Sequence, residues 1–265
     1  MKCVVLLSGG KDSVAAVEVA RQHGWDVAVA LRMLPAEDDA WMFHTPNLDV
    51  VEGIADCMGL PLVTASARAD PEAEVDDLEA ALRRIRDEHG VDAIISGALA
   101  SDYQKTRIDR IGHRLGLKTF APLWHKAPHP YVQGLITAGY DMRFSRVACD
   151  GLDETWAGAA LDAGALARLA VLRSRPNVAG EGGEYETIVL DAPHFTKRLV
   201  IDAADVEATA SRATWHVRAW HTEDKAADAV NAAEVVDATT GANVANSAKA
   251  AKAAKTGKTA RPADA

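Results

Sequence analysis

Short apolar runs alternate with amphipathic segments through the first half of the chain. Runs of strand length that are rich in Val, Ile and Leu are typical of buried strands. We expect such strands at residues 2–7, 26–34, 60–66, 91–96 and 117–120. Between them, apolar residues recur at the three-to-four spacing of a helix, which predicts helices at residues 14–22, 46–59, 73–88 and after Ser101. Strands and helices that alternate in this way form βαβ units, so the pattern predicts an α/β fold with a parallel sheet covered on both faces.

The pattern changes after residue 125. We expect helices at residues 132–139 and 163–174, and strands at residues 142–149, 188–190, 199–202 and 215–220. We therefore interpret residues 1–125 as one domain and residues 126–221 as a smaller α+β domain.

From residue 222 the chain has few large apolar side chains. This composition is typical of a disordered tail. The lysines at positions 249, 252, 255 and 258 fall on one helical face, so a weak basic arm for RNA or a ribosomal partner is the alternative.

The net negative charge lies in the body of the chain. The chain has 29 Lys and Arg against 38 Asp and Glu, and residues 222–265 contain six of each sign, which leaves 23 basic (29 − 6) and 32 acidic residues (38 − 6) before them. Arginine outnumbers lysine in that body. An acidic, lysine-poor surface suits a salt-rich cytoplasm, so we expect a halophilic archaeal source. It also argues against nucleic acid as a partner, because the neutralisation of phosphates needs a basic patch.

Cysteine usage bears on the compartment. Cys3, Cys57 and Cys149 lie far apart and form no C-x-x-C pair, which favours a reducing environment and argues against a cysteine-bound zinc or iron–sulfur site. No signal peptide precedes the first apolar run, and no run approaches the length of a membrane span. We therefore expect a cytoplasmic protein without a membrane partner.

A glycine loop joins the first expected strand to the first expected helix. Its residues are Ser8, Gly9, Gly10, Lys11, Asp12 and Ser13. The free N–H groups of such a loop, and of the first turn of the helix, favour a phosphate. Lys11 adds a positive charge, and Asp12 is a candidate ligand of Mg²⁺. The spacing differs from that of a Walker A loop and of the dinucleotide motif, and an ordinary strand-to-helix turn is the alternative.

Several segments follow expected strands and should meet at one edge of the sheet. Ligands of parallel sheets bind at the carboxyl ends of the strands. The glycine loop, the region of Arg32, residues 97–104 and residues 122–124 all fall at such ends. Ser101 is a plausible N-cap of the helix that follows.

Residues 180–187 form a second candidate site. The segment carries carboxylates at Glu181, Glu184 and Glu186, with Tyr185 and Thr187 beside them. Neighbouring carboxylates can bind Mg²⁺ or an ammonium ion, or act as a general base. An acidic surface turn is the alternative.

Two other clusters carry less weight. His125 and His129 have the spacing of a metal-binding pair, but Pro128 disfavours a helix across them and no third ligand is near, so we expect no metal there. We interpret Trp41 and Phe43 as side chains that pack under a loop.

The glycine loop resembles the PP-loop of the ATP pyrophosphatases, which split ATP into AMP and pyrophosphate. The chain as a whole resembles the diphthine–ammonia ligase family. Four segments carry this resemblance: SGGKDS at 8–13, GALASDYQKTRID at 97–109 with RLGL at 114–117, APLW at 121–124, and GEGGEYET at 180–187. The resemblance implies a Rossmann-like parallel sheet of the PP-loop (HUP) type. It also implies ATP-dependent amidation of diphthine on elongation factor 2, with free ammonium as the nitrogen donor.

The resemblance implies three sets of residues, with ATP and Mg²⁺ as cofactors and Asp12 as the metal ligand. The ATP contacts would be Ser8, Gly9, Gly10, Lys11, Asp12, Ser13, Arg32, Met33 and Gly97. The substrate contacts would be Asp102, Tyr103, Gln104, Arg107, Tyr185 and Thr187. The catalytic groups would be Lys11, Asp12, Glu181, Glu184 and Glu186.

Two rival functions remain open. A tRNA-modifying PP-loop enzyme would share the loop, although the acidic body and the lack of cysteine ligands weigh against it. A sensor that binds ATP without turnover would not need clustered carboxylates. Release of AMP and pyrophosphate in the presence of substrate would distinguish an enzyme from a sensor.

Overall fold

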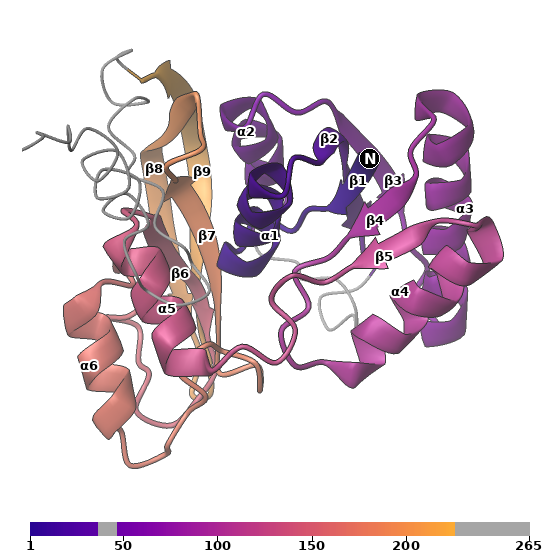
Figure 1. Cartoon of the computed structure of the whole chain (residues 1–265). Helices are drawn as coiled ribbons and strands as arrows, with labels where there is room; N and C mark the ends of the chain where they lie inside the picture. Colours follow the sequence, from indigo (N-terminus) through magenta and orange to yellow (C-terminus); the bar gives the residue numbers. More distant parts are fainter. Residues whose placement is uncertain (37–46, 226–265) are drawn as a thin grey trace, which may run out of the picture.

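The computed structural model describes residues 1–36 and 47–225 (Figure 1). Five strands form a parallel sheet in the order β3-β2-β1-β4-β5. They are β1 (Lys2–Leu6), β2 (Asp26–Leu34), β3 (Leu62–Ser66), β4 (Ala93–Ile95) and β5 (Lys118–Phe120). Each strand lies within an apolar run that predicted it, and the order is that of a Rossmann-like sheet. The predicted fold class is confirmed.

Helices cover both faces of this sheet. They are α1 (Lys11–Gln22), α2 (Val50–Cys57), α3 (Pro71–His89) and α4 (Asp102–Leu115). The first two lie on one face and the last two on the other (Figure 1). Successive side chains of a strand point to opposite faces, so Val4 packs with residues of α3 and α4, whereas its neighbour Val5 packs with residues of α1 and α2.

Two helix starts show how capping sets an element's boundary. Helix α1 begins at Lys11 with Gly10 as its N-cap, earlier than the expected start at Val14, because the first turn is polar and carries no apolar signal. Ser101 caps α4 as predicted, and its hydroxyl accepts a hydrogen bond from the N–H of Gln104 (3.3 Å).

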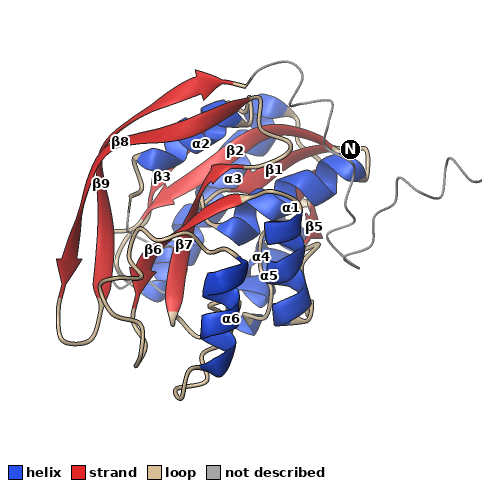
Figure 2. Cartoon of the chain, turned by 90° about the vertical axis from the view of Figure 1, so that its left-hand side faces the viewer, coloured by secondary structure: helices blue, strands red, loops and turns tan. Residues whose placement is uncertain are grey.

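A second sheet has four antiparallel strands in the order β7-β6-β9-β8. They are β6 (Asp141–Val147), β7 (Tyr185–Asp191), β8 (Lys197–Ala208) and β9 (Ala213–Asp224), and the helices α5 (Pro128–Thr137) and α6 (Ala163–Val171) precede β6 and β7. The hairpin of β8 and β9 is longer than the two short strands predicted (Figure 2). The second half of β8 is exposed, so backbone pairing with β9 extends the hairpin where no apolar pattern could show it.

The two sheets enclose α1 and α2 between them (Figure 1). One apolar core runs from β1 through these helices to the second sheet. Gly53 of α2 marks the closest approach, because a Cβ there would lie 2.6 Å from Leu199 and from Trp220. The two halves of the described chain therefore share a core.

The folded part continues past residue 221, where we expected it to end. Strand β9 runs to Asp224, and the hydroxyl of Thr222 donates a hydrogen bond to Asp56 (3.0 Å). The ammonium of Lys225 donates to Asp191 (2.8 Å). Polar pairing holds these residues, so the apolar pattern missed them.

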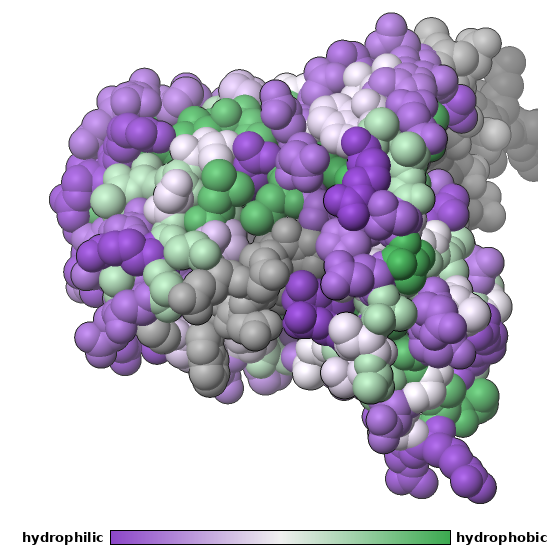
Figure 3. Space-filling model, turned by 180° about the vertical axis from the view of Figure 1, so that it is seen from behind, coloured by the Kyte–Doolittle hydropathy of each residue, from purple (hydrophilic) through white to green (hydrophobic). Residues whose placement is uncertain are grey.

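Some predictions fall on other parts of the chain. Trp41, Phe43 and the chain from residue 226 lie outside the described residues. None of the described helices has the length and apolar character needed to cross a membrane. Viewed from behind, most of the described surface is hydrophilic (Figure 3).

Candidate functional site

The carboxyl ends of β1, β2 and β4 open into a pocket of about 330 Å³. The glycine loop forms one side of it, and residues 180–188, which lead into β7, contribute the other. Its apolar lining includes Leu6, Leu31, Met33 and Ile108. The pocket thus brings together the two motifs that the sequence singled out, although they lie more than half the chain apart.

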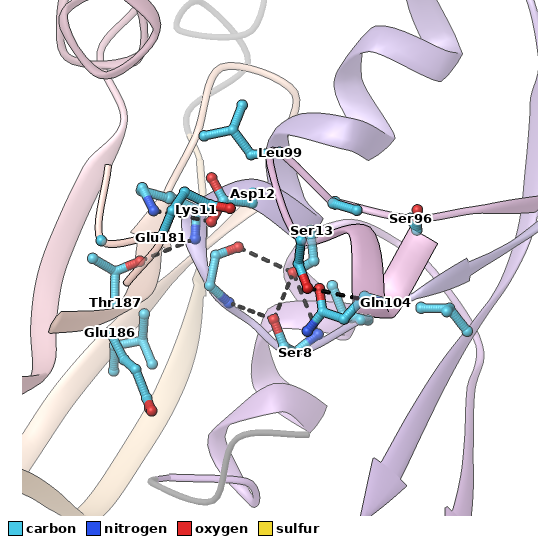
Figure 4. A pocket seen from close by; sticks show the side chains of 18 of the residues that line it. Ser8, Lys11, Asp12, Ser13, Ser96, Leu99, Gln104, Glu181, Glu186 and Thr187 are labelled. Carbon is cyan, nitrogen blue, oxygen red and sulfur yellow. Dashed lines mark hydrogen bonds and ion pairs between the residues drawn. The ribbon is translucent and has the colours of Figure 1, made fainter. Parts of the chain in front are cut away.

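The glycine loop is held in shape by its own serines (Figure 4). The hydroxyl of Ser13 donates to the carbonyl of Gly10 (3.0 Å) and accepts from the N–H of Ser8 (3.3 Å). Gly9 has a φ of +77°, a conformation that favours glycine, and a Cβ there would lie 2.8 Å from Ile54. The loop is therefore preformed at the N-terminus of a helix, where phosphates bind.

Lys11 and Asp12 form an ion pair at the start of α1. Lys11 is 4% exposed, and its ammonium donates to Oδ2 of Asp12 (2.9 Å) and to the carbonyl of Ala179 (2.5 Å). Burial disfavours the charge, but Asp12 and Tyr185 together outweigh burial and raise the pKa of Lys11. Oδ1 of Asp12 accepts a hydrogen bond from the hydroxyl of Tyr131 on α5 (2.8 Å). Both oxygens of the predicted metal ligand are thus engaged by the protein.

The second sheet also holds the glycine loop. The hydroxyl of Thr187 accepts a hydrogen bond from the N–H of Lys11 (3.1 Å), and the N–H of Val189 donates to the carbonyl of Gly9 (3.0 Å). The N–H of Lys11 is one of those that a helix cannot satisfy internally. Thr187, a predicted substrate contact, therefore lines the pocket and also caps α1 from the other sheet.

Glu181 lies inside the pocket. Its carboxylate accepts a hydrogen bond from the N–H of Ala100 (3.0 Å), which ties residues 180–187 to the turn after β4. Burial, and then the negative charge of Asp12, raise the pKa of Glu181. A carboxylate with a raised pKa is a stronger base, so this position suits proton transfer.

The two other carboxylates of this segment have different surroundings. Glu186 lines the pocket, and its carboxylate lies 3.7 Å from the guanidinium of Arg146. Glu184 is not among the lining residues. Its two oxygens accept hydrogen bonds from the N–H groups of Asn177 and Gly182 (2.8 Å each). Its geometry is that of a residue that fastens its own loop, and its catalytic role stays a prediction.

Tyr185 supports Lys11 from below. Its hydroxyl donates to the carbonyl of Val178 (2.6 Å), and the ammonium of Lys11 lies 5.4 Å from the centre of its ring. Burial raises the pKa of Tyr185 to about 12. Tyr185 therefore offers a neutral ring to the pocket and to the cation above it.

Of the four substrate contacts predicted on α4, only Gln104 lines the pocket. The guanidinium of Arg107 lies 3.3 Å from the ring centre of Tyr103, and Asp102 is exposed. Residues three and four apart share one face of a helix, so Ser101, Gln104 and Ile108 line the pocket together while the residues between them do not.

The predicted ATP contacts at the strand ends divide in the same way. Met33 lines the pocket but Arg32 does not, because neighbouring residues of a strand face opposite sides. The guanidinium of Arg32 donates to the carbonyl of Leu48 (2.6 Å) and to Thr64 (2.9 Å). Gly97 lies against α1, where a Cβ would be 2.6 Å from backbone atoms of Asp12 and Ser13.

Three further residues belong to the site and were not predicted. Ser96 and Ser145 line the pocket and are buried. Ser96 stands next to Gly97 at a strand end, which was a usable signal. Tyr131 gave no signal, because its partner Asp12 lies far away in the sequence.

The pocket has the parts that a nucleotide requires. Its apolar lining suits a base, and the preformed loop with Lys11 suits phosphates. Among residues 1–36 and 47–225, no group of three or more His, Cys, Asp and Glu gathers to hold a metal ion. His125 precedes α5 and His129 lies within it, so one helix does not present both.

Comparisons with known proteins agree on both parts of the chain. Residues 1–119 match the family model of the diphthamide synthase N-terminal domain, and residues 127–228 match that of its C-terminal domain. A diphthine–ammonia ligase of Danio rerio is 31% identical over 249 residues, which are 85% of this chain and cover 98% of that protein. The Homo sapiens protein of the same name is 30% identical over 250 residues, covering 85% of this chain and 94% of its own.

Two weaker likenesses complete the comparison. A diphthine–ammonia ligase of Schizosaccharomyces pombe is 33% identical over 225 residues, which cover 78% of this chain but 37% of that longer protein. A solved structure, titled as a predicted subunit of tRNA methyltransferase from Methanocaldococcus jannaschii, is 18% identical with a TM-score of 0.34, over 48% of this chain and 70% of that one. That structural likeness is too weak to bear on function.

Proposed function

The chain belongs to the diphthamide synthase family, and from that premise we propose that it amidates the carboxylate of diphthine on elongation factor 2. Ammonium supplies the nitrogen, and ATP is split into AMP and pyrophosphate. One observation carries the proposal: a single pocket joins a preformed phosphate loop to the carboxylates of Glu181 and Glu186.

The chemistry balances in two steps. A carboxylate oxygen of diphthine attacks the α-phosphorus of ATP, the bond to the β-phosphate breaks, and pyrophosphate leaves. Ammonia then attacks the activated carbonyl carbon, AMP leaves with the bond electrons, and a proton is released. Positive charge at the first leaving group and a base at the second step are what the protein must supply.

The residues of the pocket divide between these tasks. The glycine loop and Lys11 neutralise the pyrophosphate, and the apolar lining around Met33 receives the adenine. Glu181 and Glu186 attract ammonium, and Glu181, whose pKa is raised, takes the proton. Gln104 is the α4 residue placed to contact the reacting groups.

Some contacts are proposed outside the pocket. Diphthine is part of a protein, so its surroundings extend past the reacting carboxylate. Asp102, Tyr103 and Arg107 on α4 remain our predicted contacts to that larger substrate. Glu184 acts indirectly, since it holds the turn that carries Glu181.

Mg²⁺ is proposed as a companion of the ATP phosphates. In nucleotide enzymes it keeps several waters and takes one or two carboxylates together with phosphate oxygens. Asp12 at the loop is the predicted protein ligand, and its oxygens are shared with Lys11 and Tyr131. A cytoplasmic location and a halophilic archaeal source also stay predictions, the latter from the surface charge, and the relatives compared above are eukaryotic.

The test is direct. Purified protein with ATP, Mg²⁺, ammonium and diphthine-bearing elongation factor 2 should release AMP and pyrophosphate, and the modified residue should become about one mass unit lighter as acid turns to amide. Release of ADP would contradict the phosphate-loop assignment. AMP release with a tRNA and none with elongation factor 2 would replace the proposed substrate.

A further inference from the structure

A buried tyrosine lies behind the phosphate loop and has no part in the function proposed above. Tyr131 is on α5, in the second half of the molecule, and is 2% exposed. Its hydroxyl donates a hydrogen bond to Oδ1 of Asp12 (2.8 Å), while the ammonium of Lys11 donates to Oδ2 (2.9 Å). An ionised aspartate only accepts hydrogen bonds, so both bonds run toward Asp12.

We propose that Tyr131 is a positioning residue that fixes the carboxylate of Asp12 and, through it, the ammonium of Lys11 at the phosphate loop. The long side chain of lysine has many rotamers, and here the carbonyl of Ala179 and Oδ2 of Asp12 hold its end. Ala179 belongs to the backbone, but Asp12 is a side chain that is 26% exposed. The hydroxyl of Tyr131 keeps it from turning toward solvent.

The charge of Asp12 gives a second reason. A carboxylate beside a phosphate site repels the anion, unless its lone pairs are taken up by donors. Tyr131 and Lys11 each donate to one oxygen, and hydrogen bonds to an ionised acceptor are strong. Loss of the hydroxyl therefore both loosens the cation and leaves the anion less compensated, and both effects weaken the binding of a polyphosphate.

The chain offers a closely matched control. Tyr140 follows α5, is also buried, and its hydroxyl donates to the carboxylate of Glu18, further along α1. Tyr140→Phe therefore removes the same group from a tyrosine that bonds the same helix. Glu18 does not line the pocket, so this variant reports on packing alone.

Calorimetry of the full chain with inorganic pyrophosphate, and separately with AMP, tests the inference. Tyr131→Phe should weaken pyrophosphate binding about tenfold, or about 1.4 kcal/mol, and change AMP binding less than about twofold. Tyr140→Phe should leave both affinities within about twofold while lowering the melting temperature by a similar amount. In an Asp12→Asn background, Tyr131→Phe should have no further effect on pyrophosphate, because the two groups act as one.

Several outcomes overturn the inference. Equal losses for pyrophosphate and AMP would mean a general loosening of the pocket. The same pyrophosphate loss in Tyr140→Phe, or an effect that persists in the Asp12→Asn background, would remove the role of Tyr131. The inference rests on the proposed function only in placing phosphates at this loop. If the unaltered protein fails to amidate diphthine but Tyr131→Phe still separates pyrophosphate from AMP affinity, the proposed function fails and the positioning role stands.

Discussion

Exchanging glutamate for glutamine at positions 184 and 181 should have opposite consequences for stability and catalysis. Each exchange removes a charge and nearly preserves the shape of the side chain. Glu184 uses both oxygens to accept the N–H groups of Asn177 and Gly182 (2.8 Å each). In Glu184→Gln, one of these N–H groups meets an NH₂ donor in place of an acceptor.

The cost at Glu184 can be estimated from these bonds. A lost hydrogen bond to a charged acceptor costs about 1.5–3 kcal/mol. The Gly182 N–H is at an exposed position and can turn to water, so the lower end applies. For a protein of this size each kcal/mol lowers the melting temperature by about 2–4 °C. We therefore expect a decrease of about 3–6 °C, with any loss of activity following from the displaced loop.

Glu181→Gln should behave differently. An amide oxygen still accepts the N–H of Ala100, and burial together with Asp12 raises the pKa of Glu181. The folded state therefore favours the neutral form, and ionising Glu181 costs stability as the pH rises from the pKa of an unfolded glutamate, about 4.3, through the raised folded value. At neutral pH the variant should melt at or above the temperature of the unaltered protein, and below about pH 4 the two should coincide.

Catalysis supplies the other half of the comparison. Loss of the proposed base should lower amide formation by at least about a hundredfold in Glu181→Gln. Calorimetric melting between pH 4 and 8, and AMP release at several ammonium concentrations, measure the two effects on the same samples. If Glu184→Gln melts normally and is inactive, while Glu181→Gln is destabilised and active, the roles given to the two residues are wrong.

Three other predictions concern the loop and the end of the folded part. Gly10→Val should abolish ATP binding in calorimetry, because even its Cβ would lie 3.2 Å from the carbonyl of Thr187; normal affinity would show that phosphates bind elsewhere. Thr187→Val should lower the melting temperature by about 2–4 °C, since the buried N–H of Lys11 loses its acceptor at a cost of about 1 kcal/mol or more, whereas Thr214→Val, equally buried at 8%, should not; equal melting of the two would refute the cap. Truncation after Lys225 should preserve melting and activity, and truncation after residue 221 should lower the melting temperature, because it removes the bonds of Thr222 and Lys225 to the folded part; the reverse order would place the boundary wrongly.

Local sequence determined the first sheet and the loop at its edge. The five strands are short, strongly apolar and buried on both faces, and their signal does not depend on a distant partner. The glycine loop follows from residue types that permit φ > 0 and from the helix that starts after it. Glu181, Gln104 and Met33 were placed correctly in the pocket because strand ends converge in any parallel sheet.

Tertiary structure decided the direction in which individual side chains point. The motif at residues 180–187 could not show that Glu184 turns back on its own loop while Glu181 and Glu186 face the pocket. The same holds for Tyr131, whose bond to Asp12 joins residues far apart in the sequence. It holds also for the hairpin of β8 and β9, which depends on pairing between polar strands. A sequence pattern reports the average environment of an element, whereas a hydrogen bond requires two groups within about 3 Å, and only the packed fold brings such groups together.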